Sequence, residues 1–195
     1  MKILLITLLL AFGTQSWAKS VTETYSVKNY EEAEKSPNYI RFDMESTKAG
    51  IFTTSFTGLV KQFSVHLNLT KNGAQNINIS FNTVQMDTDN GSRNEKMHDY
   101  CLEKDKYPTI NVRILDPITF NQKKVVNAIL NIRGKDKPIK LMTDNTVVDG
   151  KATVKGSTVV KLSELEIPDP SILVASVDDK VVLRYNVSFE LDGSK

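Results

Sequence analysis

The sequence contains little cysteine, histidine or tryptophan, and these shortages argue against several classes of protein. Cys101 is the single cysteine, so no intrachain disulfide can form. The two histidines, His66 and His98, lie far apart and show no ligand spacing. Structural zinc sites need four clustered ligands, and catalytic sites usually take three from the protein. We therefore expect no metal site.

An excess of charge of one sign is also missing. The chain has 25 Lys and Arg residues against 23 Asp and Glu residues, a formal net charge of +2. Proteins dedicated to nucleic acid or to anionic membranes are usually much more basic. We expect no nucleic-acid partner.

Motifs for catalysis are absent as well. The sequence has no Gly-x-Ser-x-Gly nucleophile elbow and no glycine-rich phosphate loop. Arg93, His98 and Asp99 could form an acid–base group at a barrel mouth. Arg93 and His98 are not three or four residues apart, so the grouping is weak. We expect no enzyme activity, and these three residues define the enzymatic alternative.

The only long apolar run lies at the N-terminus. It spans residues 3–12 and is followed by Ser16-Trp17-Ala18. The run is too short to span a membrane and is typical of a secretory signal peptide cut after Ala18. We predict a signal peptide at residues 1–18 and one domain at residues 19–195. The mature protein is then soluble, periplasmic or secreted, and without a transmembrane segment.

Alternation of apolar and polar residues dominates the rest of the chain. The clearest case is the last strand, with Val181, Leu183 and Tyr185 on one face and Val182 and Arg184 on the other. Residues 31–37 are charged and are interpreted as a surface excursion. About eight to ten such segments in hairpin order predict an all-β antiparallel barrel or sandwich.

One helical segment interrupts this pattern, within residues 82–114. Ser92 is the predicted N-cap, with Glu95 at the capping-box position. Met97, Tyr100 and Cys101 are predicted to share one apolar face. The segment could plug one end of a packed barrel or cover a ligand cavity.

The same stretch and two others resemble the YceI-like family of exported bacterial lipid-binding proteins. That family has a Ser/Asn-x-x-x-Thr-like turn, a helix start of the form Arg-Asp-x-His-Leu, a Tyr/Phe-Pro-x-Ile strand and an Ile-Arg-Gly segment before a Pro. The matching segments are residues 82–88, 93–97, 106–110 and 127–139, with Val154-Lys155-Gly156 and the closing strand in order behind them. The family's Arg-Asp pair is Arg93-Asn94 here, and its early Asp-x-x-His-Ser element is not recognisable.

The resemblance implies a lipocalin-like barrel of about eight strands that a short helix closes at one end. It also implies a carrier protein that holds an isoprenoid, a quinone or another long acyl-chain amphiphile and performs no catalysis. Arg93 and Asn94 are the polar residues of the family motif. The missing His element means that a head-group preference cannot be carried over.

Large side chains on the predicted inward faces are the candidates for the wall of an apolar pocket. They are Phe42, Phe52, Phe56, Phe63, Phe81, Ile110, Leu130, Tyr185 and Phe189, with Met97, Tyr100 and Cys101 as the lid. The alternative is a structural or stress-related interaction module whose interior is filled by these side chains. The expected partner is a long-chain apolar small molecule. The sequence leaves the choice between a monomer and a homodimer open.

Overall fold

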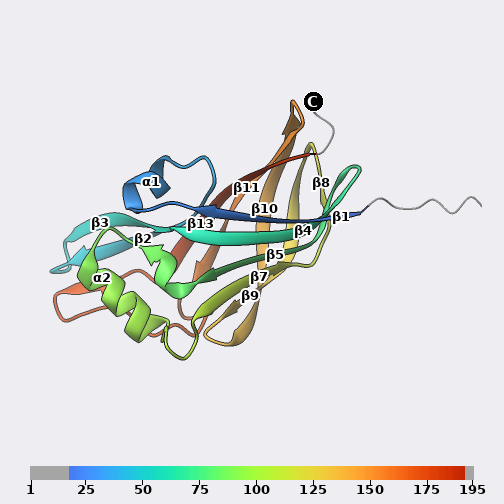
Figure 1. Ribbon diagram of the computed structural model, residues 1–195. Helices are drawn as coiled ribbons and strands as arrows, with labels where there is room; N and C mark the ends of the chain where they lie inside the picture. Colours follow the sequence, from blue (N-terminus) through green and yellow to red (C-terminus); the bar gives the residue numbers. More distant parts are fainter. Residues whose placement is uncertain (1–17, 192–195) are drawn as a thin grey trace, which may run out of the picture.

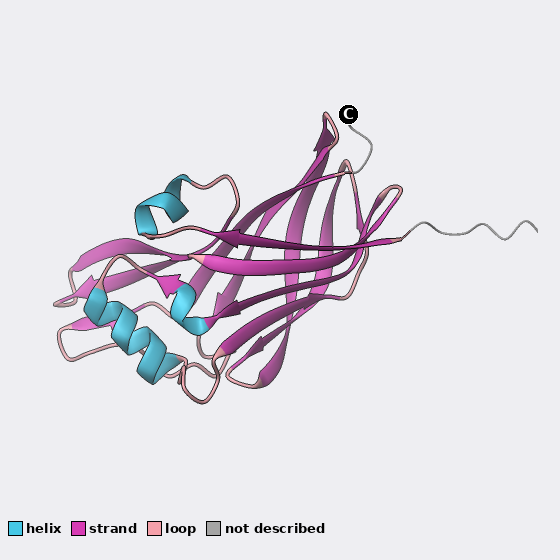
Figure 2. Cartoon of the chain, in the orientation of Figure 1, coloured by secondary structure: helices cyan, strands magenta, loops and turns pink. Residues whose placement is uncertain are grey.

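The computed structural model describes residues 18–191, so the predicted signal peptide lies outside the described residues except for Ala18. Within this range thirteen strands pair antiparallel in one strongly curled sheet that forms a half-barrel (Figure 1). Short helices lie at one end of the sheet (Figure 2). No helix in this part of the chain is long and apolar enough to cross a membrane.

The strands vary widely in length. They are β1 (Lys19–Ser26), β2 (Tyr39–Lys48), β3 (Phe52–Val60), β4 (Gln62–Thr70), β5 (Gly73–Asn82), β6 (Met86–Asp87), β7 (Thr109–Ile114), β8 (Ile118–Thr119), β9 (Gln122–Ile132), β10 (Lys135–Val148), β11 (Lys151–Lys161), β12 (Ala175–Val177) and β13 (Lys180–Glu190). The helices are α1 (Tyr30–Lys35), the 3₁₀ turn η1 (Thr83–Gln85), α2 (Gly91–Glu95) and the π-helix η2 (Lys96–Cys101).

The pairing order explains the curl. Neighbours follow the order β1-β4-β5-β7-β9-β10-β11-β13-β2-β3-β6, with β8 on β5 and β12 on β2. β3 and β4 therefore lie near opposite ends of the path, yet only Lys61 separates them in the chain. The Lys61 amide donates to Gln85 O at 2.8 Å, and Lys61 O accepts from the Val27 amide at 3.0 Å. The sheet has to wrap round until its ends meet at this residue.

Alternation in the sequence becomes burial on the concave face. In β4 the side chains of Phe63, Val65 and Leu67 are buried, while Gln62 and His66 are exposed. The expected inward residues of β9, from Val126 to Ile132, are buried in the same alternating way. The antiparallel all-β prediction is confirmed.

The strand count needs correction, and two N-terminal segments have regular structure. The sheet has thirteen strands instead of about eight, and three of them, β6, β8 and β12, are only two or three residues long. Residues 19–26 form the edge strand β1, which is held by pairing with β4 although none of its side chains is fully buried. The charged segment at residues 30–35 is a helix capped by Asn29, whose side chain accepts from the Glu32 amide at 2.9 Å.

The buried apolar side chains form two clusters. One contains Phe63, Val126 and Phe189, and the other contains Phe42, Leu102 and Leu165. The second cluster joins the sheet to η2 and to the loop between β11 and β12. These two segments are called the cover below, defined as residues 91–102 and 162–174.

Gly156 allows a close approach inside the sheet. It pairs directly with Tyr185, whose hydroxyl donates to Met142 O on the next strand at 2.8 Å. A Cβ atom at position 156 would lie 1.8 Å from Met142 O and 2.6 Å from the Tyr185 hydroxyl oxygen. The missing side chain is therefore required for Tyr185 to cross strand β11.

We expect Gly156→Ala to lower the free energy of unfolding by about 1–3 kcal/mol or more, because a backbone carbonyl cannot move away as a flexible side chain can. Urea unfolding measures the change. Gly91→Ala is the matched control, since nothing lies within 4 Å of its added Cβ, and its effect should stay within about 0.5 kcal/mol. Equal effects of the two substitutions would contradict this packing role.

Candidate functional site

An apolar cavity of about 570 Å³ lies between the concave face of the sheet and the cover. Its wall takes residues from β2 to β13, and residues of α2, η2 and the 162–177 segment also line it. Ligand pockets in proteins typically occupy about 300–1,000 Å³ and are largely apolar. The volume and lining of this cavity fit an apolar small molecule.

Seven of the nine predicted wall residues line this cavity. They are Phe42, Phe56, Phe81, Ile110, Leu130, Tyr185 and Phe189. Burial raises the pKa of the Tyr185 phenol, so this group stays neutral at physiological pH. The phenol already donates to Met142 O, which leaves it no free proton for a ligand.

The other two candidates, Phe52 and Phe63, do not line the cavity. Phe52 is 65% exposed, because it begins β3 at the hairpin end, where no described element packs over its side chain. Phe63 is buried, but its ring stacks on Tyr25 with centroids 4.9 Å apart, and it does not line the cavity. Alternation predicts which face a residue shares but not what packs against that face.

The structure places two of the three predicted lid residues on the cavity wall. Met97 and Cys101 line the cavity, whereas Tyr100 is 53% exposed. The reason is the π-helical turn, in which the Leu102 amide donates to Met97 O at 2.9 Å. The wider turn places Cys101 and Leu102, rather than Tyr100, toward the sheet. The prediction that Ser92 is the N-cap of this helical segment is wrong.

Asn90 caps the helix instead. Its side chain accepts from the Arg93 amide at 2.9 Å, so α2 begins one residue before Ser92. Asn and Ser are equally good N-caps, and the preceding Asp89 has a positive φ that sets the turn at this position.

Arg93 lies on the cavity wall with its guanidinium held in place. It stacks over the Phe56 ring at 4.2 Å and donates to Thr88 O at 2.6 Å. Its Nε is buried and has no hydrogen-bond partner among the described residues. Burial lowers the pKa of this guanidinium, with a smaller opposing effect from Tyr30 and Asp89.

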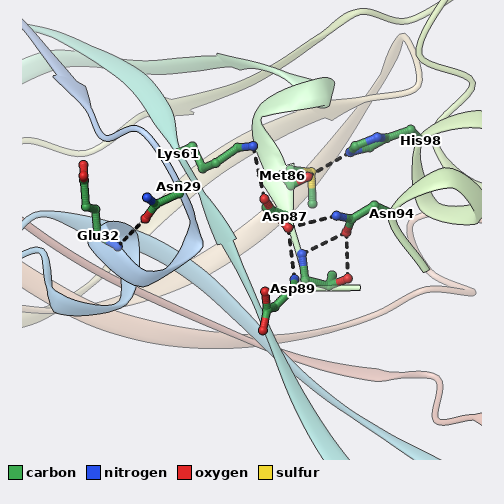
Figure 3. Close-up of polar contacts among 9 residues, drawn as sticks. Asn29, Glu32, Lys61, Met86, Asp87, Asp89, Asn94 and His98 are labelled. Atoms are coloured by element: carbon green, nitrogen blue, oxygen red, sulfur yellow. Dashed lines mark hydrogen bonds and ion pairs between the residues drawn. The ribbon is translucent and has the colours of Figure 1, made fainter. Parts of the chain in front are cut away.

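Asn94 organises a polar network behind the cavity wall (Figure 3). Its carbonyl oxygen accepts from the Thr88 amide at 2.9 Å and from the Thr88 hydroxyl at 2.7 Å. Its amide nitrogen donates to Asp87 Oδ1 at 2.8 Å, and Asp87 also pairs with Lys61 at 3.1 Å. The network links α2 to the residue where the sheet ends meet.

The side-chain amide of Asn94 donates to the Asp87 carboxylate without adding a negative charge beside it. Burial opposes ionisation of Asp87, but hydrogen bonds from Asn94, the Asp89 amide and Lys61 outweigh it and lower the pKa of this carboxyl. A carboxylate at position 94, as in the family motif, would face Asp87 with like charge. The Asn at position 94, in place of the Asp of the family motif, therefore suits the negative charge of Asp87.

The enzymatic alternative required Arg93, His98 and Asp99 to act together, and their side chains have separate partners. His98 Nε2 lies 2.8 Å from Met86 O, and Asp99 pairs with Lys104 at 2.6 Å. Neither His98 nor Asp99 lines the cavity. Within residues 18–191, no group of three or more His, Cys, Asp or Glu side chains is placed to hold a metal ion.

Charged groups fasten the cover to the β9–β10 hairpin. Arg133 pairs with Glu103 just after η2 and donates to Glu166 O at 2.8 Å. Glu166 also pairs with Lys135 and, at 2.5 Å, with Lys137. Hydrogen bonds from these two lysines lower the pKa of Glu166 to about 2. The cover is therefore anchored by charged contacts at the end that lies on the β9–β10 hairpin.

The cavity reaches the surface at its other end. The exposed lining residues there are Lys48 on β2, Asn90 and Ser92 at the start of α2, and Ile172. We call this opening the mouth. Among the described residues that line the cavity, every charged one is basic: Lys48, Arg93, Lys96 and Arg184. Arg184 is already paired with Asp43.

Sequence reasoning missed several of these residues. Lys48 and Lys96 belong to no sequence motif, and no pattern singles them out. Leu162, Leu165 and Ile167 also line the cavity. Their spacing of three and two residues follows neither a helix nor a strand, but three large apolar side chains within six residues are a usable signal of burial.

We expect Asn94→Asp to destabilise the protein by about 1–3 kcal/mol near neutral pH, because it removes the donor to Asp87 and adds a like charge. The paired carboxyls would have a raised pKa in the folded state. The loss of unfolding free energy caused by the two carboxylates is thus absent below the unfolded-state pKa of about 4. It grows as the pH rises from there through the pKa of the carboxyls in the folded state.

Urea unfolding at pH 3.5 and pH 7 measures this effect. Ser92→Asp adds the same charge to the same helix away from Asp87 and serves as the control. A destabilisation that is equal at both pH values would contradict the assigned contact.

Cys101 gives a chemical probe of the cover. Its thiol is buried, and burial raises its pKa, which lowers the fraction of reactive thiolate. We expect a maleimide to label Cys101 about tenfold or more slowly compared with Ser176→Cys, an exposed position, in a Cys101→Ser background. Mass spectrometry over time gives the rates, and equal rates would mean that the cover is open.

Comparisons with known proteins agree with this fold. A family model for the YceI-like domain matches residues 32–189. The structure resembles Burkholderia cenocepacia BcnA at a TM-score of 0.61 and 14% identity, over 77% of this chain and 96% of that one.

Two further solved structures are similar. One is a polyisoprenoid binding domain from Saccharophagus degradans, with a TM-score of 0.58 and 16% identity over 78% of this chain and 94% of that one. The other is the Campylobacter jejuni YceI protein, with a TM-score of 0.57 and 19% identity over 70% and 85%. The search of curated proteins gives no match. From the extent of the family match, we conclude that this chain belongs to the YceI-like family.

Proposed function

We propose that this protein is a carrier that holds one long apolar chain, an isoprenoid, a quinone or an acyl chain, in its cavity and performs no chemistry on it. The observation that carries the proposal is the apolar cavity of about 570 Å³ under the cover. A filled structural module would not leave this space, since protein interiors are normally close-packed.

Two further points support a carrier. The separated partners of Arg93, His98 and Asp99 give no basis for acid–base catalysis at the mouth. A protein of the same fold is described as a polyisoprenoid binding domain. We extend that ligand class to this chain because the cavity of this chain is apolar and suits a long hydrocarbon.

The free energy of binding would come from burial of the ligand. Each methylene that leaves water contributes about 0.8 kcal/mol, so ten contribute on the order of 8 kcal/mol before the costs of association. Affinity should therefore rise with chain length until the cavity is full. Few directional contacts are needed for this type of recognition.

We further propose that carriage takes place in the periplasm or outside the cell. This rests on the predicted signal peptide at residues 1–18, followed by a single YceI-like domain at residues 19–195. A chain without disulfides would depend there on its two apolar clusters for stability.

Filling the cavity tests the carrier function. Ile139 lines the cavity from β10, and in Ile139→Trp the ring should displace at least two methylenes of a bound chain. We expect the Kd of a fluorescent long-chain acyl probe to rise about tenfold or more. Fluorescence titration measures it, and unfolding curves check that the variant is folded.

Val125→Trp is the matched control, because Val125 is exposed on the neighbouring strand β9 and does not line the cavity. Its Kd should match that of the unmodified protein. A folded Ile139→Trp variant with unchanged affinity would show that the chain does not enter this cavity.

A further inference from the structure

Two turns beside the mouth expose five large apolar side chains. Ile51 is 74% and Phe52 65% exposed on the β2–β3 turn. On the turn before β12, Ile172 and Val174 are 57% and 68% exposed, and Leu173 is fully exposed. We call these five residues the apolar tip. Exposed apolar groups that gather in one place usually mark an interaction site.

Hydrogen bonds hold the two turns side by side. β12 pairs with β2, so that Ala175 lies opposite Lys48. The Ala49 amide also donates to Val174 O at 3.0 Å. The Ile172 and Ala175 backbones bond to each other in both directions, at 2.8 Å and 3.0 Å, and fix the second turn. The tip is therefore a built surface, although nothing in the described chain covers its side chains.

The tip adjoins the cavity directly. Lys48, Ile172 and Ala175 line the cavity and also belong to these two turns or to the strands next to them. An apolar chain that leaves through the mouth would pass the tip first. The start of β1 and the end of β13, close to the two ends of the described chain, lie at the opposite end of the sheet from these turns (Figure 1).

The charged side chains that line the cavity next to the tip, Lys48 and Lys96, are basic. Residues 49–57 and 170–177 contain no charged side chain. Lys48 flanks the first turn and has no carboxylate partner among the described residues, and Lys96 donates to Ser171 O at 3.1 Å beside the second. Asp169 is the nearest acid on that loop, and its carboxylate accepts from the Ser171 amide at 2.8 Å.

We propose that the apolar tip docks on a bilayer that contains anionic phospholipid, so that the mouth opens onto the membrane. The inference rests on the proposed carrier function, because direct contact spares a long apolar chain from crossing water. The five apolar side chains enter the interface between head groups and acyl chains, while Lys48 and Lys96 meet lipid phosphates.

A second copy of the chain fits this surface less well. A two-fold interface brings the same patch of each protomer together. Lys48 and Lys96 of one copy would then approach those of the other, with repulsion and no compensating acid in the tip. The charge pattern favours an anionic partner of different chemistry.

Vesicle flotation of the full chain tests the proposal. The variant Phe52→Ser/Leu173→Ser removes one large group from each turn, and Val125→Ser/Met142→Ser is the control, since both of its positions are exposed on β9 and β10 away from the mouth. We expect binding to vesicles of phosphatidylcholine and phosphatidylglycerol. The tip variant should partition about tenfold more weakly and the control unchanged. Vesicles of phosphatidylcholine alone should bind less protein.

Titration with the soluble acyl probe separates this inference from the carrier function, because the tip variant should keep the Kd of the unmodified protein. Probe binding without vesicle binding, or equal loss in both variants, would overturn the docking proposal and leave the carrier function standing. If the unmodified protein did not bind the acyl probe, both the docking proposal and the carrier function would be overturned. Light scattering that shows a dimer which the tip variant breaks would assign the tip to self-association and overturn membrane docking.

Discussion

The structure depends on one connection, the single residue Lys61 between β3 and β4. These strands lie near opposite ends of the pairing order, so the sheet has to curl until its ends meet. Backbone bonds from Lys61 to Gln85 and Val27 fix this meeting, and its ammonium group reaches Asp87. Through Asp87 and Asn94 the same residue holds the helix that covers the cavity. The curl and the cover are thus parts of one arrangement.

Curling so long a sheet leaves space inside. Its concave face is lined by apolar side chains that form two clusters without filling the volume between them. The cover is anchored by charged contacts of Arg133 and Glu166 at one end and has a mouth flanked by Lys48 and Ile172 at the other. An interior apolar enough for a long chain and an exit beside an apolar surface follow from the same geometry.

Much of the fold could be predicted from the sequence, because period-two alternation directly reports which side chains share a face. It placed the buried residues of β4 and β9 and seven wall residues of the cavity. It could not predict that Phe52 is exposed, that Phe63 packs against Tyr25 away from the cavity, or that a π-turn leaves Tyr100 exposed. The basic residues of the mouth come together only in the folded chain, and near-neutral overall composition conceals them.

The central claim is that the cavity holds a long apolar molecule. Native mass spectrometry of the full-length gene product, purified from the cells that naturally produce it, is the most direct test. We expect a complex heavier than the polypeptide by the mass of one long-chain lipid, which organic solvent releases. A spectrum that contains only the free polypeptide, together with no uptake of a fluorescent acyl probe, would contradict it.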